Sequence, residues 1–297
     1  MKICAIVDIK GHCFTTTVRA LAARMDHQFD IKTSVEYRAA TRDHGPYSAD
    51  LLYFRSWWPR LRPENARPWL VTVTTGGPVA FGRLADIATP ELLRPSAVVT
   101  QNLAVHHRAL TLGLTSAMIP NGVDSRRYHP IHAPKARRLG LAGSLANPRS
   151  CAEKGLGLGE AAATAAGCEF SQTSGLPYLE MPGWYQSLWA YCQPSEREGC
   201  SNSTMEAMAS GLPCLICKGV GYHGEACEDA REAYDGEVLF VERNTDSITA
   251  ALCQLQDDPW LYERVSDNAR RFAEAHSWER IAERFDSLVH WCVEGRC

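Results

Sequence analysis

The sequence predicts an α/β protein in which helices cover parallel sheets, divided into two domains. Short apolar segments alternate with segments of helical periodicity, which is the pattern of parallel sheets. A segment rich in proline, histidine and basic residues, 126–138, interrupts the alternation and is interpreted as a linker, and the alternation then restarts. The chain has 297 residues, enough for two domains of ordinary size.

The first half of the chain opens with a continuous apolar run, 2–7, which we interpret as a buried strand. A glycine-containing loop follows. Thr15 and Thr16 are expected to cap the next helix, because threonine hydroxyls accept hydrogen bonds from free N–H groups. Further strands are expected in three apolar segments: 50–54, 69–74 and 96–100.

The second half repeats this pattern. A strand is expected at 138–143 and a helix at 155–167. Another strand ends in the segment 187–195, and two more strands are expected at 213–217 and 237–241. Residues 168–188 compress the usual strand, helix and strand, so part of the second sheet is expected to be missing. The end of the chain is helical. Its three helices are marked by the apolar stripe from Ile248 to Leu255, by the start at Asp258 and Pro259, and by the cap Ser277.

Charge and composition limit the classes of partner. The net charge of −3 and the pI near 6.4 give no electrostatic argument for nucleic acid as the main partner. No apolar window approaches the length of a membrane span, and the first residues resemble a strand rather than a signal peptide. A cytoplasmic protein is therefore expected. Among twelve cysteines, Cys214 and Cys217 form a C-x-x-C that could bind zinc, but their segment has the pattern of a buried strand, which favours core residues.

The segment from Ser195 to Pro213 carries the chemistry. Ser201, Asn202, Ser203 and Thr204 are all favourable N-cap types and stand just before a predicted helix. A helix N-terminus presents free N–H groups and the positive end of the dipole, so it binds phosphate. The preceding strand delivers this loop to the carboxyl end of a parallel sheet, where ligands bind in such folds.

Two carboxylates flank this phosphate cradle. Glu198 lies in the loop, and Glu206 lies seven intervening residues later on the helix. An ionised carboxylate only accepts hydrogen bonds, so it binds vicinal hydroxyls well. Hydroxyls on both sides of a diphosphate are the layout of a nucleotide sugar. The alternative, two solvated surface glutamates, is disfavoured by the whole motif around them.

This motif resembles the signature of retaining GT-B glycosyltransferases of family 4, the glycosyl transferases group 1. In that signature a glutamate, seven residues and a second glutamate precede A-M-A-x-G-x-P. The resemblance extends over 115–290, and over 1–100 it is loose. Other matching stretches follow in the family's order: 119–124 with Tyr128 and Pro130, 141–144 with Lys154 and Gly155, and Ser277 with Trp278.

The resemblance implies two Rossmann-like domains that face a cleft, in a compact version of the GT-B fold. Residues 1–130 would be the acceptor-side domain and 131–275 the nucleotide-sugar-binding domain, and a helix at 276–297 would cross back to the first domain. It also implies retaining transfer of a sugar from a nucleoside diphosphate sugar, UDP- or GDP-linked, to a hydroxyl acceptor. No metal is expected, because no D-x-D motif stands where a metal-dependent transferase needs one, and no cofactor is expected besides the donor.

The resemblance also assigns roles to residues. Glu198 would contact the donor sugar, Lys154 would hold the diphosphate, and Arg149 would supply a second positive charge. Glu206 would bind the ribose. The other donor-binding positions are Gly11, Gly143, Ser144, Gly199, Cys200, Ser201, Asn202 and Ser203. Two positions depart from the family: Ser144 replaces an arginine, and Thr75, Gly76 and Gly77 stand where a histidine is common.

Two other functions fit the sequence. One is a non-catalytic nucleotide-sugar-binding protein, which the departures at Ser144 and Thr75 favour. The other is a different GT-B enzyme, such as a nucleotide-sugar epimerase or a hydrolase. The acceptor is open: a glycan, a lipid, a small molecule or, least favoured because the chain is acidic, a nucleic acid. The aromatic and arginine-rich segment 53–69 is a candidate acceptor surface or a charged core edge.

Overall fold

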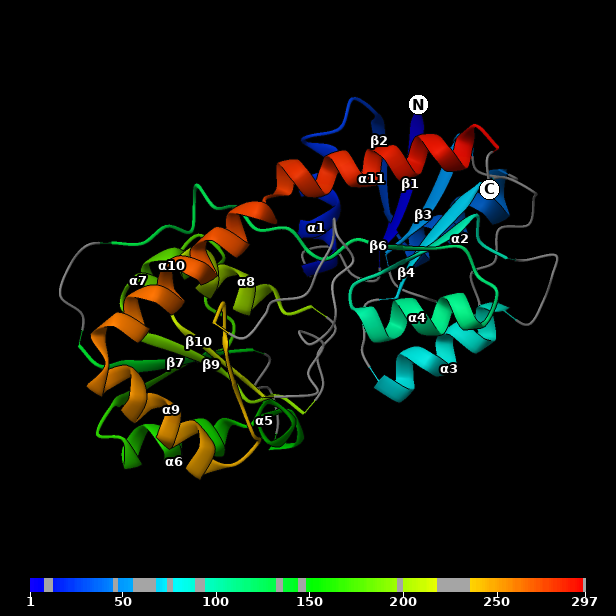
Figure 1. Cartoon of the computed structure of the whole chain (residues 1–297). Helices are drawn as coiled ribbons and strands as arrows, with labels where there is room; N and C mark the ends of the chain where they lie inside the picture. Colours follow the sequence, from blue (N-terminus) through cyan, green and yellow to red (C-terminus); the bar gives the residue numbers. More distant parts are fainter. Residues whose placement is uncertain are drawn as a thin grey trace. The chain divides into compact units, whose positions relative to one another are not determined.

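The computed structural model describes most of the chain, in two compact units. Unit 1 consists of Met1–Asn121 and Trp278–Cys297, and unit 2 of Gly122–Ser277 (Figure 1). The sequence predicts the limits at residues 130 and 275. The described residues are 1–7, 13–44, 48–55, 68–73, 77–88, 94–131, 136–143, 148–196, 200–217 and 236–295.

Unit 1 is built on a six-stranded sheet in the order β2-β1-β3-β4-β5-β6, with every neighbouring pair parallel. The strands are β1 Lys2–Val7, β2 Gln28–Thr33, β3 Leu51–Phe54, β4 Trp69–Val73, β5 Ala97–Thr100 and β6 Ser116–Met118. The helices are α1 Cys13–Ala22, α2 Ser34–His44, α3 Gly77–Ala88, α4 Leu103–Thr111 and α11 Trp278–Val293.

Both faces of this sheet are buried. Along β1, Ile3 and Ala5 pack with residues of α1 and α11, whereas Cys4 and Ile6 pack with residues of α2, α3 and α4. This alternation follows from the period of two in a strand. Burial on both faces also explains why β1 is apolar throughout rather than alternating. Figure 1 shows α11 and the pair α3 and α4 on opposite sides of the strands.

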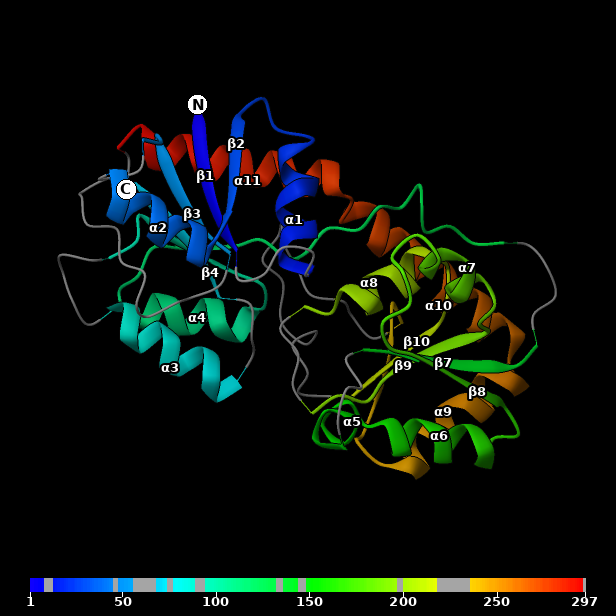
Figure 2. The ribbon, with the colours of Figure 1, turned by 180° about the vertical axis from the view of Figure 1, so that it is seen from behind.

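Unit 2 contains a five-stranded parallel sheet in the order β11-β10-β9-β7-β8. Its strands are β7 Arg138–Ala142, β8 Glu169–Thr173, β9 Ala190–Gln193, β10 Cys214–Cys217 and β11 Leu239–Val241. Its helices are α5 Pro148–Lys154, α6 Leu156–Ala165, α7 Met181–Gln186, α8 Asn202–Ala209, α9 Thr245–Asp257 and α10 Pro259–Ala275. One core packs α8 and α10 on the sheet, and another packs α6 and α9 on its other face (Figure 2).

The predicted α/β class with parallel sheets is confirmed, and so are most predicted strands. Cys214 and Cys217 lie fully within the buried strand β10, as their pattern predicts. Asp258 caps α10 by accepting the N–H of Leu261 at 3.0 Å, as predicted. None of the helices in the described part of the chain combines the length and apolar character that a bilayer span requires.

Three predictions about local structure are wrong. The segment 168–188 is not missing part of the second sheet: it contains the edge strand β8 and the six-residue helix α7, and β9 follows directly. Thr15 and Thr16 lie inside α1, which begins at Cys13, and the Thr15 side chain is buried. The segment 126–138 does not begin as a linker, because Tyr128 is buried in the core of unit 2.

Arg270 on α10 holds the segment around Tyr128 in place. Its guanidinium donates to the backbone oxygens of Tyr128 at 2.6 Å and Ser125 at 3.0 Å, and to that of Ala209 at the end of α8. Val123 adds a backbone hydrogen bond to the oxygen of His276 at 3.0 Å. Residues 123–128 are therefore attached to α10 and α8 within unit 2.

Candidate functional site

The N-terminus of α8 is built as the sequence predicts. Ser201 is the N-cap, and its hydroxyl accepts the N–H of Thr204 at 3.3 Å. The Ser201 and Ser203 hydroxyl oxygens lie 2.8 Å apart. The helix follows β9, which lies between β10 and β7, so its free N–H groups stand at the carboxyl end of the parallel sheet.

A buried polar network supports this helix start. The Tyr191 hydroxyl oxygen lies 2.8 Å from Oε1 of Gln193 and 2.9 Å from the Ser203 hydroxyl. The same oxygen lies 3.4 Å from the backbone oxygen of Ala142, the last residue of β7. The ends of β7 and β9 and the first turn of α8 are thereby fixed to one another, which makes the arrangement rigid before any ligand arrives.

Lys154 comes to the same edge of the sheet. A Cβ atom at Gly143, directly after β7, would lie 3.3 Å from Cε of Lys154. The lysine stem therefore lies over the glycine, which has no side chain to displace it. Because Gly143 follows Ala142, the Lys154 stem lies beside the end of β7, to which the start of α8 is connected through Tyr191.

The conformation of Gly155 explains why a glycine follows Lys154 in the sequence. Its φ of 71° is a left-handed conformation, and an added Cβ would lie 2.4 Å from the backbone oxygen of Pro194. The N–H of Glu196 also donates to the backbone oxygen of Glu153 at 2.7 Å. The end of α5 is thus packed directly against the loop that follows β9.

Arg243 is a residue of this region that sequence reasoning missed. It donates from Nε to the oxygen of Pro194 at 3.0 Å and from Nη2 to the oxygen of Ala152 at 2.7 Å. Arg243 comes two residues after β11, at the carboxyl edge of the sheet, and this position could have identified it from the sequence. Its hydrogen bonds fasten the β9 loop to α5.

Arg149 lies on the surface of α5. Its side chain is 84% exposed and forms an ion pair with Glu153 at 2.9 Å. Exposed pairs at this helical spacing contribute little energy, so the pair does not fix the guanidinium strongly. A role in phosphate binding remains a prediction.

Glu206 lies one turn into α8, among tyrosines. The Tyr185 hydroxyl lies 3.0 Å from Oε2 of Glu206 and 3.0 Å from the backbone oxygen of Ser203. Burial raises the pKa of the Glu206 carboxyl from 4.5 to about 7, and the hydrogen bond from Tyr185 partly opposes the rise. At neutral pH this carboxyl therefore exists in both protonation states.

Two more tyrosines complete this environment. Burial and then the charge of Glu206 raise the pKa of Tyr128 and of Tyr178. Tyr178 stands edge-on to Tyr128 and is partly exposed, and the guanidinium carbon of Arg127 lies 4.7 Å from the centre of its ring. Sequence reasoning missed this tyrosine cluster, because its members lie far from Glu206 along the chain.

Not every predicted site residue falls in the described part of the chain. The structure places Gly143 with Lys154, and Cys200, Ser201, Asn202 and Ser203 at the start of α8 with Glu206 one turn further. Gly11, Ser144, Glu198 and Gly199 lie outside the described residues, as do Thr75, Gly76 and most of 53–69. The described residues can bind an anion at α8 and Lys154 and hydroxyl groups at Glu206.

Comparison with known sequences finds a match for the region that contains Lys154, the start of α8 and Glu206. Residues 146–258 match the model of the family Glycosyl transferases group 1. A segment of 117 residues is 34% identical to an MMP alpha-(1->4)-mannosyltransferase of Mycolicibacterium hassiacum, covering 37% of this chain. A second segment is 28% identical over 106 residues to an uncharacterised glycosyltransferase of Haemophilus influenzae. The matched segments span 26% and 29% of those two proteins.

Solved structures resemble the whole chain. A sucrose-phosphate synthase of Thermosynechococcus elongatus aligns with a TM-score of 0.77 and 16% identity, covering 98% of each chain. The Anabaena protein HepE in complex with UDP aligns with a TM-score of 0.70 and 12% identity, covering 98% of this chain and 100% of its own. The fold is that of GT-B glycosyltransferases, as the sequence predicts.

Proposed function

Residues 146–258 match the glycosyl transferases group 1 model, and from this match we propose that the protein is a retaining glycosyltransferase. It takes a sugar from a nucleoside diphosphate sugar and transfers it to a hydroxyl acceptor. One observation carries the proposal. Lys154 and the capped N-terminus of α8 both lie at the carboxyl end of β7, and Glu206 lies one turn into that helix.

The diphosphate is the part of the donor that this arrangement fits best. The N–H groups at the start of α8 point toward the sheet edge, and the helix dipole adds partial positive charge there. The Lys154 ammonium supplies a full charge beside them. The network through Tyr191 holds these groups in place, so little reorganisation is needed when charge develops on the leaving diphosphate. Arg149 is assigned the second positive charge.

Glu206 is assigned to the ribose. Its carboxylate already accepts one hydrogen bond from Tyr185 and has further lone pairs for the two ribose hydroxyls. Those hydroxyls would favour the ionised carboxylate and so lower the pKa that burial raises. Tyr178, partly exposed beside Glu206, has a ring face on which a nucleobase can stack.

Transfer proceeds with retention of configuration and without a protein nucleophile. The bond between the anomeric carbon and the diphosphate oxygen breaks, and the electron pair stays on the diphosphate. The acceptor hydroxyl attacks the same face, and a donor phosphate oxygen takes its proton. Glu198 is assigned to hydroxyls of the donor sugar. UDP is the first nucleotide to test, because HepE has been solved with UDP and with UDP-glucose.

A second candidate is a nucleotide-sugar-binding protein without transfer activity. Arg149, which should supply the second charge on the leaving group, is 84% exposed and paired with Glu153, and Ser144 replaces the arginine typical of the family. Both observations favour weaker stabilisation of the departing diphosphate.

The test is thermal unfolding with UDP, GDP, ADP, dTDP and CMP and their common sugar conjugates, followed by transfer assays with the donor that binds. A nucleotide at 100 times its dissociation constant should stabilise the protein by about 2.7 kcal/mol. Lys154→Met should reduce this stabilisation, and Arg264→Met, an equal charge change on the exposed side of α10, should not. Binding without turnover over a broad acceptor panel would favour the second candidate. No stabilisation by any nucleotide would contradict both.

A further inference from the structure

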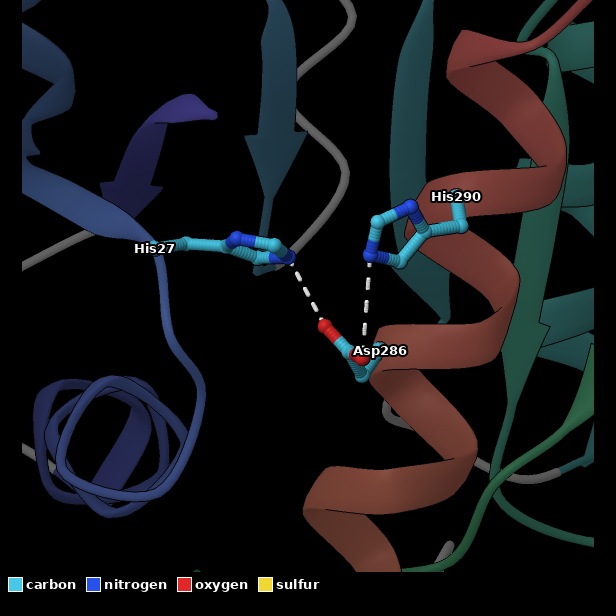
Figure 3. A group of neighbouring side chains, drawn as sticks. All are labelled: His27, Asp286 and His290. Atoms are coloured by element: carbon cyan, nitrogen blue, oxygen red, sulfur yellow. Dashed lines mark ion pairs between the residues drawn. The ribbon is translucent and has the colours of Figure 1, made fainter.

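A group of three side chains in unit 1 lies outside everything assigned to the donor. His27, in the turn before β2, faces Asp286 and His290 on α11 (Figure 3). The Nε2 atom of His27 lies 2.7 Å from Oδ1 of Asp286, and Nε2 of His290 lies 3.8 Å from Oδ2 of the same carboxylate. One ligand atom from each residue lies within 4.8 Å of the others.

His27 is the buried member, and its hydrogen-bonding capacity is unused. Its side chain is only 5% exposed. Neither of its ring nitrogens has a hydrogen-bond partner among the described residues, and the same holds for Oδ1 of Asp286. The 2.7 Å contact between them is therefore close without the geometry of a hydrogen bond. Buried polar atoms are normally satisfied, so these atoms point to a missing partner.

We propose that His27, Asp286 and His290 bind a divalent transition-metal ion, with Zn²⁺ as the best-fitting ion. Two imidazole nitrogens and one carboxylate are ligands that zinc prefers, and a fourth position remains for water. In a tetrahedral site with bonds near 2.05 Å, neighbouring ligand atoms lie about 3.3 Å apart. The two histidine nitrogens lie 2.7 and 3.8 Å from the two carboxylate oxygens of Asp286, distances of the same order as that spacing.

The backbone arrangement suits such a site. Asp286 and His290 stand four residues apart on α11, so they share one face of the helix. The His27 turn is fixed by two backbone hydrogen bonds of 2.9 Å, from His27 to the oxygen of Met25 and from Gln28 to the oxygen of Met1. Figure 3 shows the two imidazole rings on either side of the aspartate.

The ion would have a structural effect. It would join the turn before β2 to the last part of α11, a helix that supplies Phe285 and Val289 to the core of unit 1. Bound metal stabilises the folded state, because the unfolded chain does not present the ligands together. This inference does not depend on the proposed transferase activity, since all three residues belong to unit 1, whereas Lys154, the start of α8 and Glu206 belong to unit 2.

The experiment uses the full chain, dialysed against EDTA and then against buffer. Zn²⁺ binding is measured by calorimetry, and Co²⁺ binding by its visible absorption, with wild type, His27→Gln, His290→Gln and the control His107→Gln. His107 is an exposed histidine on α4 outside the cluster. Wild type and His107→Gln should bind one Zn²⁺, and the two cluster variants should bind it at least about tenfold more weakly.

Thermal unfolding gives a second readout. Zn²⁺ should raise the Tm of wild type and of His107→Gln, and EDTA should reverse the rise. His290→Gln tests the site without threatening the fold, because the His290 side chain is 50% exposed. Zn²⁺ affinity unchanged in both cluster variants would overturn the proposal. A Co²⁺ spectrum with thiolate charge-transfer bands in every protein would likewise overturn it, by assigning the metal to the cysteines.

Discussion

The hydroxyl of Tyr185 lies 3.0 Å from the carboxylate of Glu206 and 3.0 Å from the backbone oxygen of Ser203. A phenol has a single proton to donate, so it cannot satisfy both oxygens fully. When Glu206 is ionised, its charge attracts that proton, and when it is protonated, Ser203 becomes the better acceptor. The protonation state of Glu206 is therefore coupled to the first turn of α8, where the diphosphate is proposed to bind.

The raised pKa of Glu206 predicts how stability depends on pH. The carboxyl titrates near 4.5 when unfolded and at about 7 when folded. The folded state therefore holds an extra proton between these values, and the stability that this provides is complete below pH 4.5 and lost as the pH rises through 7. The shift corresponds to roughly 3 kcal/mol.

Glu206→Gln should therefore remove much of the loss of stability between pH 5 and pH 8. Urea unfolding at both pH values measures it. Glu160→Gln, on the exposed side of α6, is the matched control and should follow wild type. The same pH dependence in wild type and Glu206→Gln would show that this carboxyl titrates normally.

The two glutamates of the motif should differ in function. Glu206→Ala should lose nucleotide affinity, because it removes the proposed acceptor for the ribose hydroxyls. Glu198→Ala should lose turnover more than nucleotide binding, because its proposed contact is with the sugar. Calorimetry with the nucleotide alone and turnover with the sugar conjugate separate these effects. Equal nucleotide affinity in wild type and Glu206→Ala would contradict the ribose assignment.

Gly155→Ala should destabilise unit 2 by about 2 kcal/mol or more, because the residue has positive φ and its Cβ would collide with the Pro194 oxygen at 2.4 Å. Gly157→Ala is the matched control. It lies in α6 with no atom within 4 Å of its added Cβ, so it should stabilise by about 0.5 kcal/mol. Chemical denaturation compares the two, and equal effects would show that Gly155 is not required by its conformation.

Arg270→Met should cost about 2–4 kcal/mol, because it leaves the backbone oxygens of Ser125, Tyr128 and Ala209 without their charged donor. Arg271→Met removes the same charge from the next position of α10, where the side chain is exposed and donates a hydrogen bond to Oδ1 of Asn268. It should change stability by less than about 0.5 kcal/mol. Equal unfolding midpoints for the two variants would contradict the role of Arg270.

The sequence predicts the central strands better than the edge strands. β1, β3, β4, β5, β9 and β10 are short apolar runs and lie within their sheets, where both faces and both edges are covered. The three strands that the sequence did not predict, β2, β6 and β8, all lie at sheet edges. Edge strands are covered on fewer sides, so segments such as 28–33 and 169–173 can contain polar residues. They then lack the continuous apolar run from which a strand is predicted.

The candidate site also has a part that the sequence predicts and a part that it does not. The start of α8 is predicted because capping is local: Ser201 acts on Thr204, three residues away. The surroundings of Glu206 are not predictable by that reasoning, because Tyr128 and Tyr178 reach it only through the tertiary fold. The pKa of Glu206 depends on those distant residues, so it could not be read from the motif.

The discontinuity of unit 1 has a consequence for protein synthesis. The ribosome completes all of Gly122–Ser277 before it makes Trp278–Cys297, the segment that returns to unit 1. Making that intervening stretch takes roughly 8 to 30 s at about 5–20 residues per second. Throughout this interval the strands of unit 1 lack Trp278, Ile281 and Phe285 of their core, and at its end unit 2 has all of its residues. The nascent chain therefore exposes apolar surface on the half that was made first, and the second half is able to fold before it.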